Sequence, residues 1–124
     1  MKQHENSEKT NSLSFYKLMD AIRQRPGLYL GRNSILAFDA WLQGYWYAQG
    51  EFGIPLTEEE IEFRGFDDFI RQKYDWDDEG GWAAKIQYYY RDDARALDEF
   101  FKLLDEFRES KTKQDNQAPK PNEN

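Results

Sequence analysis

The amino-acid sequence predicts an all-α fold, a compact bundle of five or six helices. Apolar residues recur at three- and four-residue spacings in several stretches, and a capping residue precedes most of them. Strand-like alternation is weak everywhere, so only a short hairpin near residues 28–33 stays open as an exception. Aromatic residues make up 17% of the 124 residues, and their large rings can build the core.

The first predicted helix begins after Ser14, or after Ser12, because a serine hydroxyl can accept a hydrogen bond from a first-turn amide. Pro26 and Gly27 end this helix, and residues 28–30 form a short apolar connector. The apolar face of the helix consists of Phe15, Leu18, Met19 and Ile22.

The second predicted helix begins at Ser34 and ends before the Gly-Ile-Pro segment at 53–55. It carries apolar residues nearly all round, which is typical of a helix at the centre of a bundle. We expect Phe38, Trp41 and Leu42 to lie in the core.

A third helix is predicted to follow Thr57, which has the capping-box spacing to Glu60. This helix breaks at Gly65 and resumes at Phe66. A glycine pair at 80–81 then separates it from a further apolar stretch.

The last predicted helix begins near Asp92 and should pack against the second helix. Its core-facing residues share one face, namely Leu97, Phe101 and Leu104. Polar residues dominate both ends of the chain. We therefore predict a disordered leader over residues 1–10, a single helical domain over 11–110 and a disordered tail over 111–124.

The composition argues against several classes of function. Twenty-four acidic residues against 17 basic ones give a net charge of −7, which opposes binding to nucleic acid or to an anionic membrane. The chain has no cysteine, and its only histidine, His4, lies in the predicted leader. No apolar run is long enough to span a bilayer. We expect a cytoplasmic protein that is not an enzyme and needs no cofactor.

Residues 75–80, Asp-Trp-Asp-Asp-Glu-Gly, resemble the start of an EF-hand calcium loop. Oxygen-bearing side chains occupy positions 1, 3 and 5, and glycine occupies position 6. The twelfth position requires a bidentate glutamate, but here it is Ile86. We therefore interpret the segment as an acidic loop and predict no metal site.

Acidic residues are concentrated between Glu58 and Glu79. This segment has ten carboxylates and three basic residues, so its net charge equals that of the whole chain. A single-sign surface of this kind attracts a cationic partner, although a solvated helix face with an acidic loop explains the pattern equally well.

Three consecutive tyrosines at 88–90 cannot all face the core of a helical bundle, because each residue turns the helix by about 100°. At least one of them is expected to be exposed and available to a partner. Together with the acidic segment they define the predicted partner-binding residues, which are Glu58, Glu59, Asp67, Asp68, Asp75, Trp76, Asp77, Asp78, Glu79 and Tyr89.

Residues 22–31, IRQRPGLYLG, resemble the R-P-G-M-Y-[IL]-G signature near the start of type II topoisomerase ATPase subunits such as gyrase B. The match covers only these ten residues, since the Asn-bearing helix and the Asp-x-Gly-x-Gly segment of that fold have no counterpart. We interpret the match as a coincidence of local structure, in which a helix is stopped by Pro-Gly before a short extended piece. It does not imply ATPase activity.

Over roughly residues 13–107 the pattern resembles the small immunity proteins of bacterial polymorphic-toxin and contact-dependent inhibition systems. It combines a capped helix ending in RPGLYLG, an aromatic helix SILAFDAWLQGY at 34–45, and FDDFIRQKY at 66–74. The resemblance implies a protein that binds and silences a cognate toxin inside the producing cell. It implies no catalytic residues.

The leading hypothesis is therefore a non-enzymatic inhibitor that occludes a basic toxin domain, for example a nuclease. The alternative is an adaptor or regulatory protein-binding module, for example of a phage or mobile element, since the absence of catalytic motifs fits both. A small hydrolase that uses only carboxylates is a third option, but no carboxylate pair stands out for that role.

Overall fold

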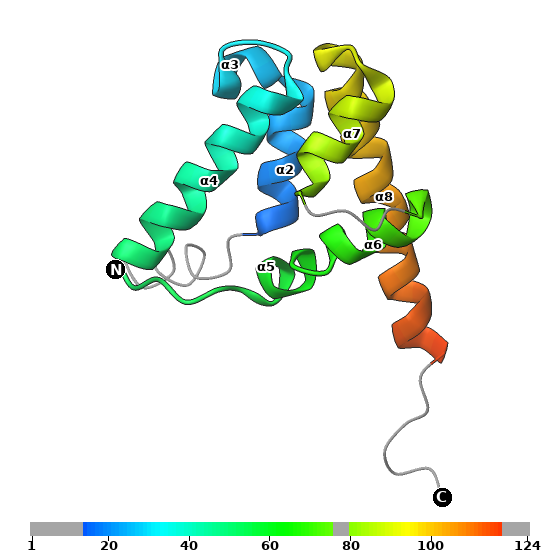
Figure 1. Cartoon of the computed structure of the whole chain (residues 1–124). Helices are drawn as coiled ribbons and strands as arrows, with labels where there is room; N and C mark the ends of the chain where they lie inside the picture. The colour runs from blue at the N-terminus through cyan, green and yellow to red at the C-terminus, as the bar shows by residue number, and fades with distance from the viewer. Residues whose placement is uncertain (1–13, 76–79, 118–124) are drawn as a thin grey trace, which may run out of the picture.

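The all-α fold predicted from the sequence is confirmed. A computed structural model describes residues 14–75 and 80–117, and this part of the chain is helical without a strand. None of its helices is both long and apolar enough to cross a membrane. The helices, shown in Figure 1, are α2 (Phe15–Gln24), α3 (Pro26–Leu30), α4 (Ile35–Glu51), α5 (Glu58–Phe63), α6 (Phe66–Tyr74), α7 (Trp82–Tyr90) and α8 (Asp93–Gln117).

The segment after α2 is a short helix, α3, so the connector and the hairpin expected near residues 28–33 are wrong. Pro26 ends α2, but it also begins α3, because proline at the first helical position lacks only an N–H that would be unpaired there. Gly31 closes α3 in the left-handed region, at φ 82°, and its N–H donates to the carbonyl of Gly27 at 2.9 Å. The extended piece expected within residues 22–31 is likewise absent.

The centre of the bundle is α8, not α4 as predicted. Only Ile35, Phe38 and Leu42 of α4 are buried, because α7 and α8 cover one side of this helix. Tyr47, near the opposite end, keeps 71% of its surface exposed. By contrast, α8 buries seven side chains, which are Ala96, Leu97, Phe100, Phe101, Leu103, Leu104 and Phe107.

The core is a cluster of aromatic rings around Phe100. The ring of Phe100 lies 4.8 Å from those of Phe38 and Trp82 and 5.3 Å from that of Phe66, measured between centroids. Phe38 also contacts Phe101 at 5.7 Å, which confirms the expected packing of α8 on α4. These contacts join α4, α6, α7 and α8 in a single core.

The predicted break at Gly65 is confirmed, and it separates α5 from α6. A Cβ atom at this position would lie 3.4 Å from the carbonyl oxygen of Glu62 and 3.8 Å from the ring of Phe107. These are ordinary van der Waals distances and Gly65 has a right-handed helical φ of −80°, so the turn close to α8 does not itself require glycine.

The last helix runs to Gln117 and so extends past residue 110, where the sequence placed the start of a tail. Figure 1 shows its final turns projecting beyond the other helices. Residues 111–117 contain neither glycine nor proline, and the first proline follows at Pro119. Without a breaker, a helix already anchored on the core continues into polar sequence.

Candidate functional site

One hollow on the described surface is a groove of about 1070 Å³ between α2, the end of α4 and α5. Its floor is apolar and includes Phe15, Leu18 and Leu56, while Glu58 and Glu59 also line it. A groove with an apolar floor and carboxylates is suited to a partner that is both apolar and basic.

The segment between α4 and α5 leaves two large apolar side chains uncovered beside this groove. Phe52 is 77% exposed and Ile54 is 55% exposed, and both line the groove. These two residues are not among those predicted from the sequence to bind a partner. A signal was present, since they flank Gly53 and precede Pro55 in a segment that cannot continue a helix.

Acidic side chains of α5 fasten this helix to the start of α2. Glu59 accepts hydrogen bonds from the hydroxyl of Ser14 at 2.7 Å and from the backbone N–H of Tyr16 at 2.8 Å. Glu62 accepts one from the Tyr16 hydroxyl at 2.8 Å, and the guanidinium of Arg108 lies 4.2 Å from the Tyr16 ring centre. Burial and the bond to Glu62 raise the pKa of the Tyr16 hydroxyl above its ordinary value.

Glu60 is buried, with 2% of its surface exposed, and it joins α5 to α4. Its carboxylate accepts hydrogen bonds from the Tyr45 hydroxyl at 2.5 Å, the Gln49 amide at 2.9 Å and the Thr57 backbone N–H at 2.8 Å. Burial acts to raise the pKa of Glu60, but these hydrogen bonds together outweigh burial and hold the pKa below its ordinary value. Burial and the same bond raise the pKa of Tyr45.

The predicted capping box between Thr57 and Glu60 is confirmed. Its additional bonds to α4 depend on tertiary contact, and the local pattern gave no sign of them. Because Glu60 and Tyr45 fix the distance between α4 and α5, they also hold the walls of the groove.

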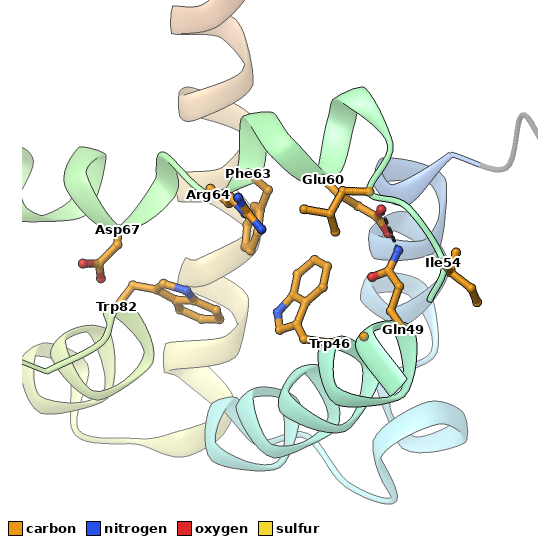
Figure 2. Close-up of a pocket in the computed structure, with 10 residues that line it drawn as sticks. Trp46, Gln49, Ile54, Glu60, Phe63, Arg64, Asp67 and Trp82 are labelled. Carbon is orange, nitrogen blue, oxygen red and sulfur yellow. Dashed lines mark hydrogen bonds between the residues drawn. The ribbon is translucent and has the colours of Figure 1, made fainter. Parts of the chain in front are cut away.

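A second cavity, of about 450 Å³, adjoins the groove on the other side of Glu60. Figure 2 shows the indoles of Trp46 and Trp82 on one side of it and Phe63 opposite them. Gln49 and Asp67 also line this cavity. Both indoles are half-buried and pack on the core. The ring centroid of Trp82 lies 4.8 Å from that of Phe100, and the ring centroid of Trp46 lies 5.5 Å from that of Phe15.

Of the acidic residues predicted to bind a partner, the structure describes five, and two of these five make bonds within the protein. Glu58 and Asp68 are exposed. Glu59 is hydrogen-bonded to the start of α2, and the Asp67 carboxylate pairs with Arg71 at 3.1 Å. Asp75 is exposed at the end of α6, in the left-handed region at φ 55°.

Tyr89 is exposed, as the run of tyrosines predicts, and 57% of its surface is accessible. Its ring lies 4.8 Å from that of Tyr74, so the end of α6 and the end of α7 meet at this point. Neither cavity wall includes Tyr89. The other predicted residues of this region, Trp76, Asp77, Asp78 and Glu79, lie outside the described residues.

Neither a metal centre nor a relative assigns a function to these surfaces. Within residues 14–75 and 80–117 there is no group of three or more histidine or acidic residues that could hold a metal ion. Comparison with known protein families, curated proteins and solved structures finds no match to this chain.

Proposed function

We propose that this protein is an immunity protein that binds a basic toxin domain and blocks its active site without performing chemistry. The single observation that carries the proposal is the groove between α2, α4 and α5. It combines an apolar floor, the exposed Phe52 and Ile54, and the exposed carboxylate of Glu58. That the partner is a toxin follows from the resemblance to immunity proteins given above.

The apolar side chains of the groove would supply most of the binding free energy. Contiguous exposed apolar patches mark interaction sites on proteins, and aromatic anchors dominate protein interfaces. Phe52 stands on a segment whose two ends are joined through Glu60, which limits the backbone freedom lost when a partner covers it.

The net charge of −7 would select the partner and speed the encounter. Long-range attraction raises the association rate of oppositely charged proteins, and salt reduces this effect. Inhibition would be steric, because a helical domain bound over an active-site cleft excludes the substrate. Blocking of this kind is stoichiometric.

The test begins with affinity purification of the tagged full-length chain from its native cells. The groove variant carries Phe52→Ser and Ile54→Ser, and the matched control carries Leu28→Ser and Leu36→Ser. Leu28 and Leu36 are also large, exposed apolar residues, but they line neither cavity. The proposal expects a basic protein that the parent and the control retain and the groove variant loses.

The captured protein is then expressed alone and assayed for growth inhibition and for its own activity. Titration with the parent chain should abolish that activity with a break at a fixed molar ratio. If the activity of the captured protein is unchanged when it is saturated with the parent chain, the immunity function is wrong and the adaptor function takes its place. Complete neutralisation by a far substoichiometric amount would overturn the blocking mechanism.

A further inference from the structure

One side of α4 is exposed and uncharged, and we call it the outer face. Its residues recur at alternating four- and three-residue spacings and are all exposed, namely Leu36, Ala40, Gln43, Tyr47 and Gly50. Leu36 keeps 48% of its surface exposed and Tyr47 keeps 71%. The neighbouring helices α7 and α8 pack on the other side of α4, where Phe38 contacts Trp82 and Phe100. Alternating spacings of four and three are typical of the seam along which one helix packs against another.

Gly44 lies on the outer face, close to the middle of α4. Glycine is a poor residue for the interior of a helix, and the backbone of Gly44 is ordinary α-helix. A Cβ atom at this position would meet nothing within 4 Å. The packing of the described residues therefore does not require glycine here. A bare backbone at this point would let the backbone of a second helix approach closely.

The two ends of the outer face carry charges of opposite sign. Residues 23–36 contain three arginines and no acidic residue, whereas residues 51–62 contain five glutamates and no basic residue. Figure 1 shows α3 and the segment that follows α4 at opposite ends of this helix. The 17 residues of α4 span about 25 Å, whereas exposed charges act over about 8–10 Å in physiological salt. The two sets of charges therefore cannot neutralise each other within one chain.

Charge favours an antiparallel pair of α4 helices from two copies of the chain. Arg25 and Arg32 are exposed before the start of α4, and Glu51 and Glu58 are exposed at and beyond its end. An antiparallel pair brings the arginines of one copy close to the glutamates of the other at both ends. A parallel pair would instead bring like charges together, which costs affinity.

We propose that two copies of this chain form an antiparallel dimer, related by a two-fold axis, through the outer faces of α4. The axis passes close to Gly44, and Tyr47 of one copy packs against Ala40 of the other. A single helix pair is a small interface, so we expect micromolar affinity. The inference goes beyond the proposed function and does not depend on it, because Leu36, Ala40, Gln43 and Tyr47 line neither the groove nor the second cavity.

The first test is the oligomeric state of the full chain, measured by analytical ultracentrifugation from about 1 µM to about 500 µM. We expect monomer at the low end of this range and dimer at the high end. A chain that is still monomeric at about 500 µM would overturn the proposal. Species that grow beyond a dimer would also overturn it, because a two-fold contact closes after two copies.

Gly44→Arg separates dimer formation from folding. The added side chain would stand between the two helices, so the dimer should weaken at least about tenfold. Arginine is a better helix former than glycine, so the urea midpoint of the monomer should not fall. The control is Gln72→Arg, which places the same charge on an exposed position of α6 and should change dimer affinity less than about twofold. Equal dimer formation by the two variants would show that α4 is not the interface.

A charge exchange tests the antiparallel arrangement. One variant carries Arg25→Glu and Arg32→Glu, and the other carries Glu51→Arg and Glu58→Arg. Each variant alone brings like charges together at both ends, so its dimer should weaken about tenfold. An equal mixture restores opposite charges at both ends and should form a heterodimer within about threefold of the parent affinity. Recovery on mixing cannot result from misfolding of either variant.

The same experiment has a different outcome for a parallel dimer. Each variant alone would then keep about the parent affinity, because like charges already meet in the parent, and the mixture would bind more tightly than the parent. This result would overturn the antiparallel arrangement. Variants and mixture that all match the parent would show that the charged ends take no part in the contact.

The other occupant to be tested on the outer face is the basic protein of the proposed function. If the parent chain is monomeric at about 500 µM and Gly44→Arg loses the protein captured by affinity purification, the outer face binds that protein and the dimer is wrong. If Gly44→Arg loses the dimer and still retains the captured protein, the outer face is the contact between copies and the groove is a separate site.

Discussion

The hydroxyl of Tyr45 on α4 donates a 2.5 Å hydrogen bond to the buried carboxylate of Glu60 on α5. The two residues lie 15 positions apart, and the chain between them contains Phe52 and Ile54. This contact and the bond from Gln49 to the same carboxylate close the loop that presents the exposed apolar residues of the groove. The stability of this contact and the shape of the groove are therefore coupled.

Replacement of Tyr45 by phenylalanine should lower the free energy of unfolding by about 1.5–3 kcal/mol, because Glu60 loses a donor while it stays buried. Tyr47→Phe is the control, since Tyr47 is 71% exposed on the same helix. It should change stability by less than about 0.5 kcal/mol. Urea unfolding at pH 7 measures both. Equal stability of the two variants would contradict the role given to the Tyr45 hydroxyl.

Glu60 should make the protein sensitive to acid. Its pKa is lower in the folded chain than the ordinary 4.5, so its contribution to stability is complete above pH 4.5. That contribution is lost as the pH falls through the lower, folded-state pKa. Glu60→Gln should be less stable than the parent at pH 7, and the difference should shrink below pH 4.5. Urea unfolding across this range measures the effect, and a difference that is constant with pH would refute it.

The aromatic core and the groove predict opposite consequences for two phenylalanines. Phe100→Ala should destabilise the protein by about 3–5 kcal/mol, because it removes a fully buried ring that contacts Phe38, Phe66 and Trp82. Phe52→Ala removes a ring that is 77% exposed and should cost less than about 0.5 kcal/mol. Thermal and urea unfolding compare them. A similar loss in both would mean that Phe52 is part of the core.

Ser34→Ala should cost about 2 kcal/mol, at the upper end for a helix cap. The Ser34 hydroxyl accepts from the Ala37 N–H at 3.0 Å and also donates to the Asp93 carboxylate at 2.6 Å, so it links the starts of α4 and α8. Combining Ser34→Ala with Asp93→Ala should therefore cost less than the sum of the single changes. Strict additivity in urea unfolding would show that the two side chains do not act together.

Local features of the structure were predictable because they depend on residues a few positions apart. Ser14, Ser34 and Thr57 each accept a hydrogen bond from an amide three residues later, and each begins a helix. Gly65 ends one helix and precedes the next. The same local reasoning failed at Pro26, which was interpreted as a breaker although it also starts α3.

The candidate site was harder to predict because its parts come from distant positions. The segment from Glu58 to Glu79 was treated as one acidic surface, but Glu60 turns inward and Glu59 turns towards α2. Periodicity indicates that a helix has an apolar face, but it does not say which neighbour covers that face. For this reason α4 was expected at the centre, whereas it leaves Tyr47 exposed.

The sequence by itself determined the helical class, most helix boundaries and the strong negative charge. These follow from capping, spacing and composition, which act within a few residues or sum over the chain. Only the tertiary structure decided that Glu60 is buried between Tyr45 and Gln49 and that Trp46 and Trp82 line one cavity. Burial and cavities arise where helices from separate parts of the chain pack together, and no local pattern encodes that packing.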